Sequence, residues 1–233
     1  MKLKVIISLI LFAVASFFFI GATTKQLPEF KPKFLSFEIP KGWPKPPVDI
    51  YANNKLTEQG FQLGKKLFYD SRLSSDGEVS CASCHQPFSA FVTFDHDLSH
   101  GVNNSFTTRN APALMNLAWM SSYHWDGGIN HLEVQPLSPL TAANEMGQTL
   151  DSVIYFLNSD ATYKKMFKAA FNNSNITSKL MLKALAQFTG SLITSNSKYD
   201  RVVNGKDTFS TFEKKGYQLY KKNCSSCHKE PLF

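Results

Sequence analysis

The residues best suited to chemistry form a pattern that occurs twice, as CASCH at residues 81–85 and CSSCH at residues 224–228. The two copies use all four cysteines of the chain and two of its six histidines. C-x-x-C-H is the signature of covalent c-type haem attachment. Two thiols one helical turn apart can add to the two vinyl groups of one porphyrin, and the next imidazole can ligate its iron. The sequence therefore predicts two attached haems, with thiols and proximal histidines supplied by Cys81, Cys84, His85, Cys224, Cys227 and His228.

Zinc binding and disulfide formation account less well for the paired cysteines. Structural zinc sites also use two C-x-x-C pairs, but usually close together in sequence, whereas these pairs start 143 residues apart. A disulfide inside one C-x-x-C closes almost no loop and adds little stability. Neither zinc nor a disulfide explains the histidine after both pairs, so haem is the favoured interpretation.

Composition and charge indicate a globular protein but do not distinguish among most functions of such proteins. The chain has 233 residues, 43% hydrophobic and 18% charged, which is enough for one large or two small domains. Twenty phenylalanines fit the apolar walls of a haem pocket and fit an ordinary core equally well. The net charge of +7 comes largely from scattered lysines, which favours a solvated surface over a patch that steers an acidic redox partner. Nothing indicates nucleic acid.

The start of the chain is typical of an export signal. Lys2 and Lys4 precede a mostly apolar run at residues 5–20, so residues 1–21 are predicted to be a signal peptide or a membrane anchor. The run is slightly long for a cleaved signal and slightly short for a spanning helix, and both alternatives stay open. Either one predicts a periplasmic location. Residues 22–49 hold six of the eleven prolines and predict an extended linker or strap.

Hydrophobic periodicity predicts a mostly helical fold. Helices are expected at residues 57–69, 150–157, 163–171 and 177–193, with Thr57 and Thr177 as N-caps of the first and last. Strand signals are few. Residues 87–148 contain no long periodic helix and carry four of the six histidines and two of the three tryptophans. An irregular stretch with such side chains indicates a site built on loops.

An internal repeat accompanies the cysteine pattern. GFQLGKK at residues 60–66 reappears as GYQLYKK at residues 216–222, and each copy precedes its own C-x-x-C-H. The repeat predicts two related haem domains in tandem, at residues 50–196 and 197–233. The sequence stops five residues after His228, so the second domain is expected to be incomplete in this chain.

Taken together, the motifs resemble the bacterial dihaem cytochrome c peroxidases and their MauG-like relatives, from about residue 37 onwards. The stretches that carry the resemblance are GKKLFYDSRLSSDGEVSCASCH, TRNAPALMNLAW, WDGGINHLEVQPLSPL, NEMG, SNSKYDRVVNG and GYQLYKKNCSSCH. The resemblance implies an all-α fold of two tandem cytochrome c-like domains, with a peroxidatic haem first and an electron-transfer haem second. It implies reduction of hydrogen peroxide to water with electrons from a small cytochrome c or a copper protein, and often a homodimer.

The resemblance also assigns roles to three side chains outside the haem motifs. Glu145 of NEMG matches a distal glutamate, which would move a proton between the two peroxide oxygens. Gln135 matches a distal glutamine that would hydrogen-bond peroxide or water, and Trp125 matches a tryptophan that would relay electrons between the haems. Without the family, Glu145 could be a helix N-terminal charge and Trp125 a core residue.

The resemblance also suggests an iron-capping histidine and a calcium ligand. His100 lies near a family histidine that caps the peroxidatic iron, with His96 as a competing candidate, and either could be a solvated loop residue. Asn110 matches a calcium ligand, or else is a turn residue. No role is assigned to His124 or His131. Gly128 departs from the family, because relatives usually have arginine after WDG.

Two rival functions stay open. A MauG-like enzyme would oxidise residues of a partner protein, and there a tyrosine replaces the methionine that ligates the second iron in the peroxidases. That position would lie beyond Phe233. A non-enzymatic electron-transfer dihaem cytochrome would have both irons six-coordinate and unreactive towards peroxide.

Overall fold

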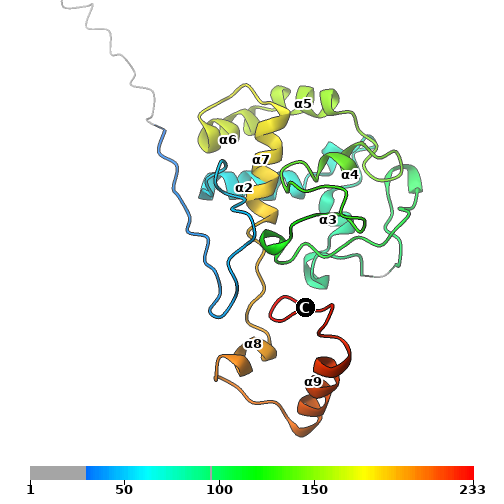
Figure 1. Cartoon of the computed structure of the whole chain (residues 1–233). Coiled ribbons are helices and arrows are strands. Elements are labelled where there is room, and N and C mark those ends of the chain that lie inside the picture. Colours follow the sequence, from blue (N-terminus) through cyan, green and yellow to red (C-terminus); the bar gives the residue numbers. More distant parts are fainter. Residues whose placement is uncertain (1–29, 95) are drawn as a thin grey trace, which may run out of the picture. The chain divides into compact units, whose positions relative to one another are not determined.

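The computed structural model describes residues 30–94 and 96–233, and in this part of the chain it shows helices joined by loops, with no extended sheet (Figure 1). Only isolated antiparallel bridges occur there, such as that between Phe34 and Thr57. The predicted mostly helical fold is therefore confirmed. Pro32–Phe233 is a unit distinct from Met1–Lys31, and most of the latter lies outside the described residues together with the predicted export signal. No helix in the described part is both long and apolar enough to cross a membrane.

The elements include α-helices and short 3-10 helices, the latter labelled η. In chain order they are α2 (Glu58–Phe68), η1 (Ser71–Leu73), α3 (Cys81–Cys84), η2 (Pro87–Ser89), η3 (Val102–Asn104), η4 (Leu117–Trp119), α4 (Leu137–Thr141), α5 (Leu150–Ser159), α6 (Ala161–Phe171), α7 (Ser178–Thr189), α8 (Lys198–Val203) and α9 (Thr211–Asn223).

Both predicted N-caps are confirmed. The Thr57 hydroxyl accepts a hydrogen bond from the Gly60 amide at the start of α2, and the Thr177 hydroxyl does the same for Leu180 in α7. Each bond satisfies an amide that has no partner inside the helix. Helix α7 ends at Thr189, however, four residues before the predicted end. Beyond Gly190, the chain pairs with Asn116, whose amide donates to the Leu192 carbonyl at 2.8 Å, and this pairing replaces further helical bonds.

Helices α2 and α7 form the main helix pair of the fold (Figure 1). Gly64 of α2 lies against the backbone of Ala184 in α7, so closely that a Cβ at position 64 would overlap the Ala184 carbonyl oxygen. At the start of α2, the buried side chain of Gln187 from α7 makes two hydrogen bonds. Its oxygen accepts from the Thr57 amide at 2.9 Å, and its nitrogen donates to the Asn54 side chain at 2.9 Å. The small residues Gly64 and Ala184, and the hydrogen-bonded side-chain amide of Gln187, therefore let the two helices approach closely.

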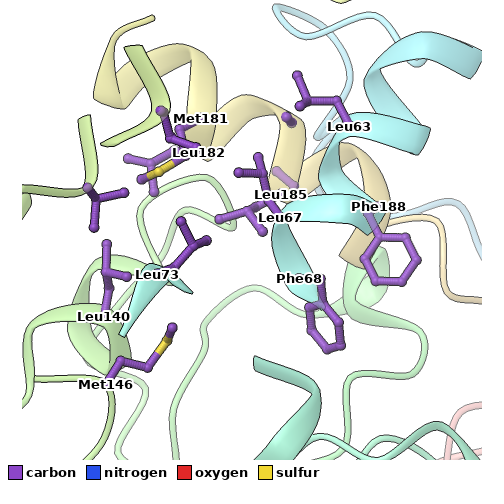
Figure 2. Close-up of a cluster of buried hydrophobic side chains, with 14 of the residues drawn as sticks. Leu63, Leu67, Phe68, Leu73, Leu140, Met146, Met181, Leu182, Leu185 and Phe188 are labelled. Carbon is purple, nitrogen blue, oxygen red and sulfur yellow. The ribbon is translucent and has the colours of Figure 1, made fainter. Parts of the chain in front are cut away.

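The core gathers where α2 and α7 meet the loops and short helices around α4. Figure 2 shows the side chains Leu63, Leu67, Phe68, Leu73, Leu140, Met146, Met181, Leu182, Leu185 and Phe188 from these elements. Leu63, Leu67 and Met181 have no exposed surface. Such burial removes apolar surface from water at about 25 cal/mol per Å² and is the main stabilising contribution.

A buried carboxylate joins η1 to α6. Asp70 accepts hydrogen bonds from the Arg72 Nε atom at 2.8 Å and from the Tyr163 hydroxyl at 2.7 Å. Burial alone would raise the pKa of Asp70, but these hydrogen bonds and the Arg72 charge outweigh it and lower the pKa to about 2. The ionised carboxylate therefore holds η1 in place beside the core residue Leu73.

The proline-rich segment makes a turn within its described part, where the Trp43 amide donates to the Pro40 carbonyl at 3.0 Å, and its role as a linker or strap stays a prediction. Residues 30–50 contain no helix. The indole nitrogen of Trp119 donates to the Pro44 carbonyl at 2.7 Å, and the ring of Trp43 packs edge-on against Trp119 at 4.9 Å between centroids. The segment is thus tied to the body by aromatic contacts and a hydrogen bond.

The two copies of the internal repeat are both helical, but they join their motifs differently. Helix α2 ends at Phe68, and a loop with η1 separates it from the first motif at Cys81. Helix α9 runs to Asn223, directly before Cys224. Residues of α2 are buried, whereas none of α9 is. The predicted domain boundaries at residues 50, 197 and 233 stay a prediction.

The glycine at the α2–α7 crossing provides a test of this packing. Gly64→Ala should destabilise the chain by about 1–3 kcal/mol, because the added methyl group meets backbone that cannot move aside alone. Gly216→Ala in α9 is the matched control, since a Cβ there meets nothing within 4 Å and alanine is the better helix former. Thermal unfolding followed by circular dichroism measures both. Equal effects of the two substitutions would contradict the close crossing.

Candidate haem site

The first cysteine motif forms its own short helix. Helix α3 consists of Cys81–Cys84, and the Ser80 amide at its start donates to the Ser83 hydroxyl at 3.0 Å. A single helical turn places the two thiols about one turn apart, as addition to two vinyl groups of one porphyrin requires. Burial raises the pKa of Cys81 to about 12 and also raises that of Cys84.

His85 follows the helix and is oriented by a backbone carbonyl. Its Nδ1 atom lies 2.8 Å from the Phe91 carbonyl oxygen, as in histidines that ligate a metal through the other ring nitrogen. Burial lowers the pKa of His85, against the opposing effect of its carbonyl partners, and so favours the neutral imidazole. A neutral imidazole is the form that binds iron.

These three residues, Cys81, Cys84 and His85, line a mostly apolar cavity. Phe68 from α2 and Met181, Leu185 and Thr189 from α7 contribute to its wall, several of them visible in Figure 2. The remaining lining residues come from η1, from the loops and from α4: Leu73, Val79, Ser80, Leu114, Gln135, Pro136, Pro139, Leu140, Glu145 and Met146. Thiols, imidazole and flat apolar walls together suit a porphyrin.

Glu145 brings a carboxylate to this cavity. Its side chain accepts no hydrogen bond within residues 30–94 and 96–233, and burial raises its pKa, with the charge of His124 acting in the opposite direction. The backbone around it is fixed, because the Glu145 carbonyl accepts from the Val102 amide at 2.8 Å and Gly101 packs directly against Asn144. A rigid turn therefore presents a carboxylate of raised proton affinity.

The alternative of a helix-terminal charge does not hold for Glu145. Helix α5 begins at Leu150 with Thr149 as its N-cap, and Asp151 supplies the acidic residue of its first turn. Glu145 lies five residues before the helix, in the turn that precedes it.

Gln135 reaches the same cavity from the segment before α4, and it contacts a histidine to which the sequence assigned no role. Its Nε2 atom lies 3.2 Å from Nε2 of His124. His124, Gln135 and Glu145 also line an adjoining polar hollow with Cys84 and His85. The contact joins positions 11 residues apart in irregular backbone, so no periodic signal could have revealed it.

Trp125 and Asn110 lie together on the surface. The Trp125 side chain is 62% exposed, and its indole nitrogen donates to the Asn110 carbonyl at 2.7 Å. The alternative of a core tryptophan is therefore wrong. The Asn110 side chain is exposed and donates to the Asp97 carbonyl at 3.1 Å. No cluster of three or more acidic, histidine or cysteine side chains suited to a metal occurs in the described chain. The calcium and electron-relay roles stay predictions.

His100 is exposed and does not line the cavity. Its ring packs on His96 at 4.9 Å and on Phe106 at 4.5 Å between centroids. Its backbone carbonyl lies 3.7 Å from the Cys84 sulfur. The loop that carries His100 thus runs beside the motif, and an iron-capping role stays a prediction.

The second motif is more open. Cys224, Cys227 and His228 are all exposed at the end of α9. The Tyr220 hydroxyl donates to the His228 carbonyl, and the Cys224 carbonyl accepts from the His228 amide at 2.9 Å. These hydrogen bonds fold residues 224–228 into a turn directly after α9.

A helical fold with a cysteine–histidine motif at an apolar cavity is typical of c-type cytochromes. Comparison with known proteins identifies the family within this class. The family model of the di-haem cytochrome c peroxidases matches residues 58–208. The methylamine utilization protein MauG of Methylophilus methylotrophus is 33% identical over 82% of this chain and 57% of its own length. The cytochrome c551 peroxidase of Nitrosomonas europaea is 32% identical over 73% of this chain and 51% of its own. The chain belongs to the di-haem cytochrome c peroxidase family, which uses haem cofactors.

Solved structures agree on the fold. A MauG-like protein associated with microbial copper homeostasis superposes with a TM-score of 0.76 at 33% identity, over 83% of this chain and 58% of that one. The diheme peroxidase BthA of Burkholderia thailandensis has a TM-score of 0.68 at 22% identity, over 78% of this chain and 52% of its own. The chain spans about half the length of the curated relatives that it matches.

The different surroundings of the two motifs predict different thiol reactivity before haem is attached. In the haem-free chain, Cys224 and Cys227 should react with iodoacetamide at least about tenfold faster than Cys81 and Cys84, because only the thiolate reacts and burial raises the pKa of the first pair. Mass spectrometry of tryptic peptides measures each rate, and unfolding in urea should bring the two rates together. Equal rates in the native chain would contradict the partial burial of Cys81 and Cys84.

Proposed function

We propose that the protein is a dihaem c-type peroxidase that reduces hydrogen peroxide to water. The observation that carries the proposal is one cavity lined by Cys81, Cys84 and His85 together with Glu145 and Gln135. The two cysteines would tether the first haem with His85 on its iron, and Cys224, Cys227 and His228 would do the same for the second. The bound haem supplies the electrons and the Lewis-acidic iron for cleavage of the O–O bond.

Glu145 is suited to move the proton that this cleavage requires. One peroxide oxygen must lose a proton and the other must gain one before it leaves as water. The Glu145 carboxylate lacks a hydrogen-bond partner within the described chain, and its pKa is raised by burial. A side chain with a pKa nearer neutrality takes up a proton and returns it more readily than an ordinary glutamate.

Gln135 would hold the oxidant or a water molecule. Its amide nitrogen is engaged by His124, and its amide oxygen has no protein partner among the described residues. A free carbonyl oxygen accepts a hydrogen bond from the O–H group of peroxide or water. Gln135 thus positions the substrate while Glu145 transfers the proton.

Electrons would come from a small cytochrome c or a copper protein and reach the first haem through the second. Trp125, exposed on the surface that carries Asn110, is the proposed relay, and Asn110 a proposed calcium ligand. His100 is proposed as a resting ligand that a loop movement would deliver. Export to the periplasm and homodimer formation complete the proposal.

Oxidation of a partner protein is the second candidate, because relatives at 33% identity carry the name MauG. The two functions differ in the fate of the oxidising equivalents. Rapid oxidation of reduced small cytochrome c by peroxide favours the peroxidase, whereas peroxide-dependent modification of a co-purified protein without such turnover favours the MauG-like enzyme.

Substitution of the cavity carboxylate tests the mechanism. In the haem-loaded protein, Glu145→Gln should lower the rate of peroxide reduction by about 10²–10⁴-fold, because the amide cannot transfer a proton. Glu133→Gln is the matched control, since Glu133 also lies in a turn next to α4 but does not line the cavity. Stopped-flow mixing with peroxide measures the rate at equal haem content. Equal rates for both variants would remove Glu145 from the mechanism.

The raised pKa of Glu145 predicts the pH dependence of the same reaction. The ionised carboxylate takes the first proton, so the rate should rise as the pH rises through the pKa of Glu145. Burial favours the neutral acid and places this midpoint above the ordinary glutamate value of about 4.3. In Glu145→Gln the rise should vanish. A rate–pH profile of unchanged shape in that variant would assign the titration to another group.

A further inference from the structure

We propose that His124 is a positioning residue that determines which end of the Gln135 amide faces the cavity. The inference deepens the proposed peroxidase function and rests on it. It assigns a role to a side chain that the sequence left without one.

The backbone holds His124 in a conformation that is unfavourable for most residues. Its φ angle is +67°, in the left-handed region that non-glycine residues seldom occupy. The loop is closed by the Tyr123 amide, which donates to the Ile129 carbonyl at 2.7 Å, and by the Gly127 amide, which donates to the His124 carbonyl at 3.2 Å. Such strain persists only where the surrounding structure imposes it, and it often marks functional positions.

The contact with Gln135 has a defined polarity. An amide nitrogen can only donate, so this contact, 3.2 Å between the two Nε2 atoms, is a hydrogen bond when the His124 imidazole is neutral and carries its proton on Nδ1. With its nitrogen held in this way, the Gln135 amide leaves its oxygen as the end available to the cavity. Without an acceptor at position 124, the amide can rotate by half a turn and offer its nitrogen instead.

This choice matters because both ends of the amide have opposite hydrogen-bonding character. An oxygen accepts from the O–H of peroxide or water, whereas a nitrogen donates to an anion. His124, Gln135 and Glu145 line the same polar hollow, so the orientation of the amide determines what the group next to the carboxylate can bind. His124 therefore acts through Gln135.

Fluoride provides a probe that separates the two orientations, because it binds ferric haem and accepts hydrogen bonds but cannot donate them. In the haem-loaded ferric protein, His124→Phe should tighten fluoride binding by about three- to tenfold, the amount that one hydrogen bond contributes. In a Gln135→Leu background, His124→Phe should have no effect. His131→Phe is the matched control, since His131 is an exposed histidine in the same segment and does not line the hollow.

The outcomes separate this inference from the proposed function. Unchanged or weakened fluoride binding in His124→Phe, or an equal change in the Gln135→Leu background, would overturn it. If the phenylalanine variant does not fold, His124→Gly removes the imidazole and suits the positive φ angle, and the same results are expected. Spectrophotometric titration with fluoride needs neither peroxide nor a donor, so tightened binding supports the role of His124 even in a protein that lacks peroxidase turnover.

Discussion

The close approach of α2 and α7 at Gly64 and Ala184 is the constraint on which the rest of the described fold depends. A glycine at the crossing lets the two helix backbones touch, and the approach brings Phe68 of one helix and Met181 and Leu185 of the other to a common apolar wall. The cysteine helix and the loop residues Gln135 and Glu145 then complete the cavity. Without this crossing, the chemistry-bearing side chains would have no shared surface to line.

Much of the framework was predictable from local sequence. Of the five helices with ten or more residues in the described chain, α2, α5, α6 and α7 follow from hydrophobic periodicity. The caps at Thr57 and Thr177 follow from the preference of threonine hydroxyls for unpaired amides. The C-x-x-C-H spacing implied thiols one helical turn apart, and residues Cys81–Cys84 do form one such turn with His85 at its end. The end of α7 was predicted wrongly, because the pairing of Leu192 with Asn116 is a contact between distant parts of the chain.

The site itself was predictable only in part, for the same reason. The resemblance to a family pointed to Glu145 and Gln135, but the sequence could not show that they share a cavity, nor that the Glu145 carboxylate lacks a partner. The His124–Gln135 contact and the exposure of Trp125 depend on loop geometry. Loops carry no repeating pattern, so their side-chain contacts follow from tertiary packing alone.

The two copies of the repeat show how one sequence pattern can serve two environments. In the first copy, an inserted loop lets α2 turn away and bury its residues against α7, while α3 starts afresh at Cys81. In the second copy, α9 continues directly to the motif and keeps its surface exposed. Because of this additional loop, α2 can pack against α7 while the thiols of Cys81 and Cys84 take their position from a separate helix, α3.

The Asp70 carboxylate beneath Arg72 and Tyr163 has a consequence for behaviour in acid. Its pKa in the folded chain, about 2, lies below the usual value of about 3.9 for an unfolded aspartate, so its stabilising contribution is present above that value and lost as the pH falls towards 2. Asp70 anchors η1, and η1 ends with Leu73 in the cavity wall. Acidification would therefore weaken the hold on η1 and, with it, the position of Leu73 in the cavity wall.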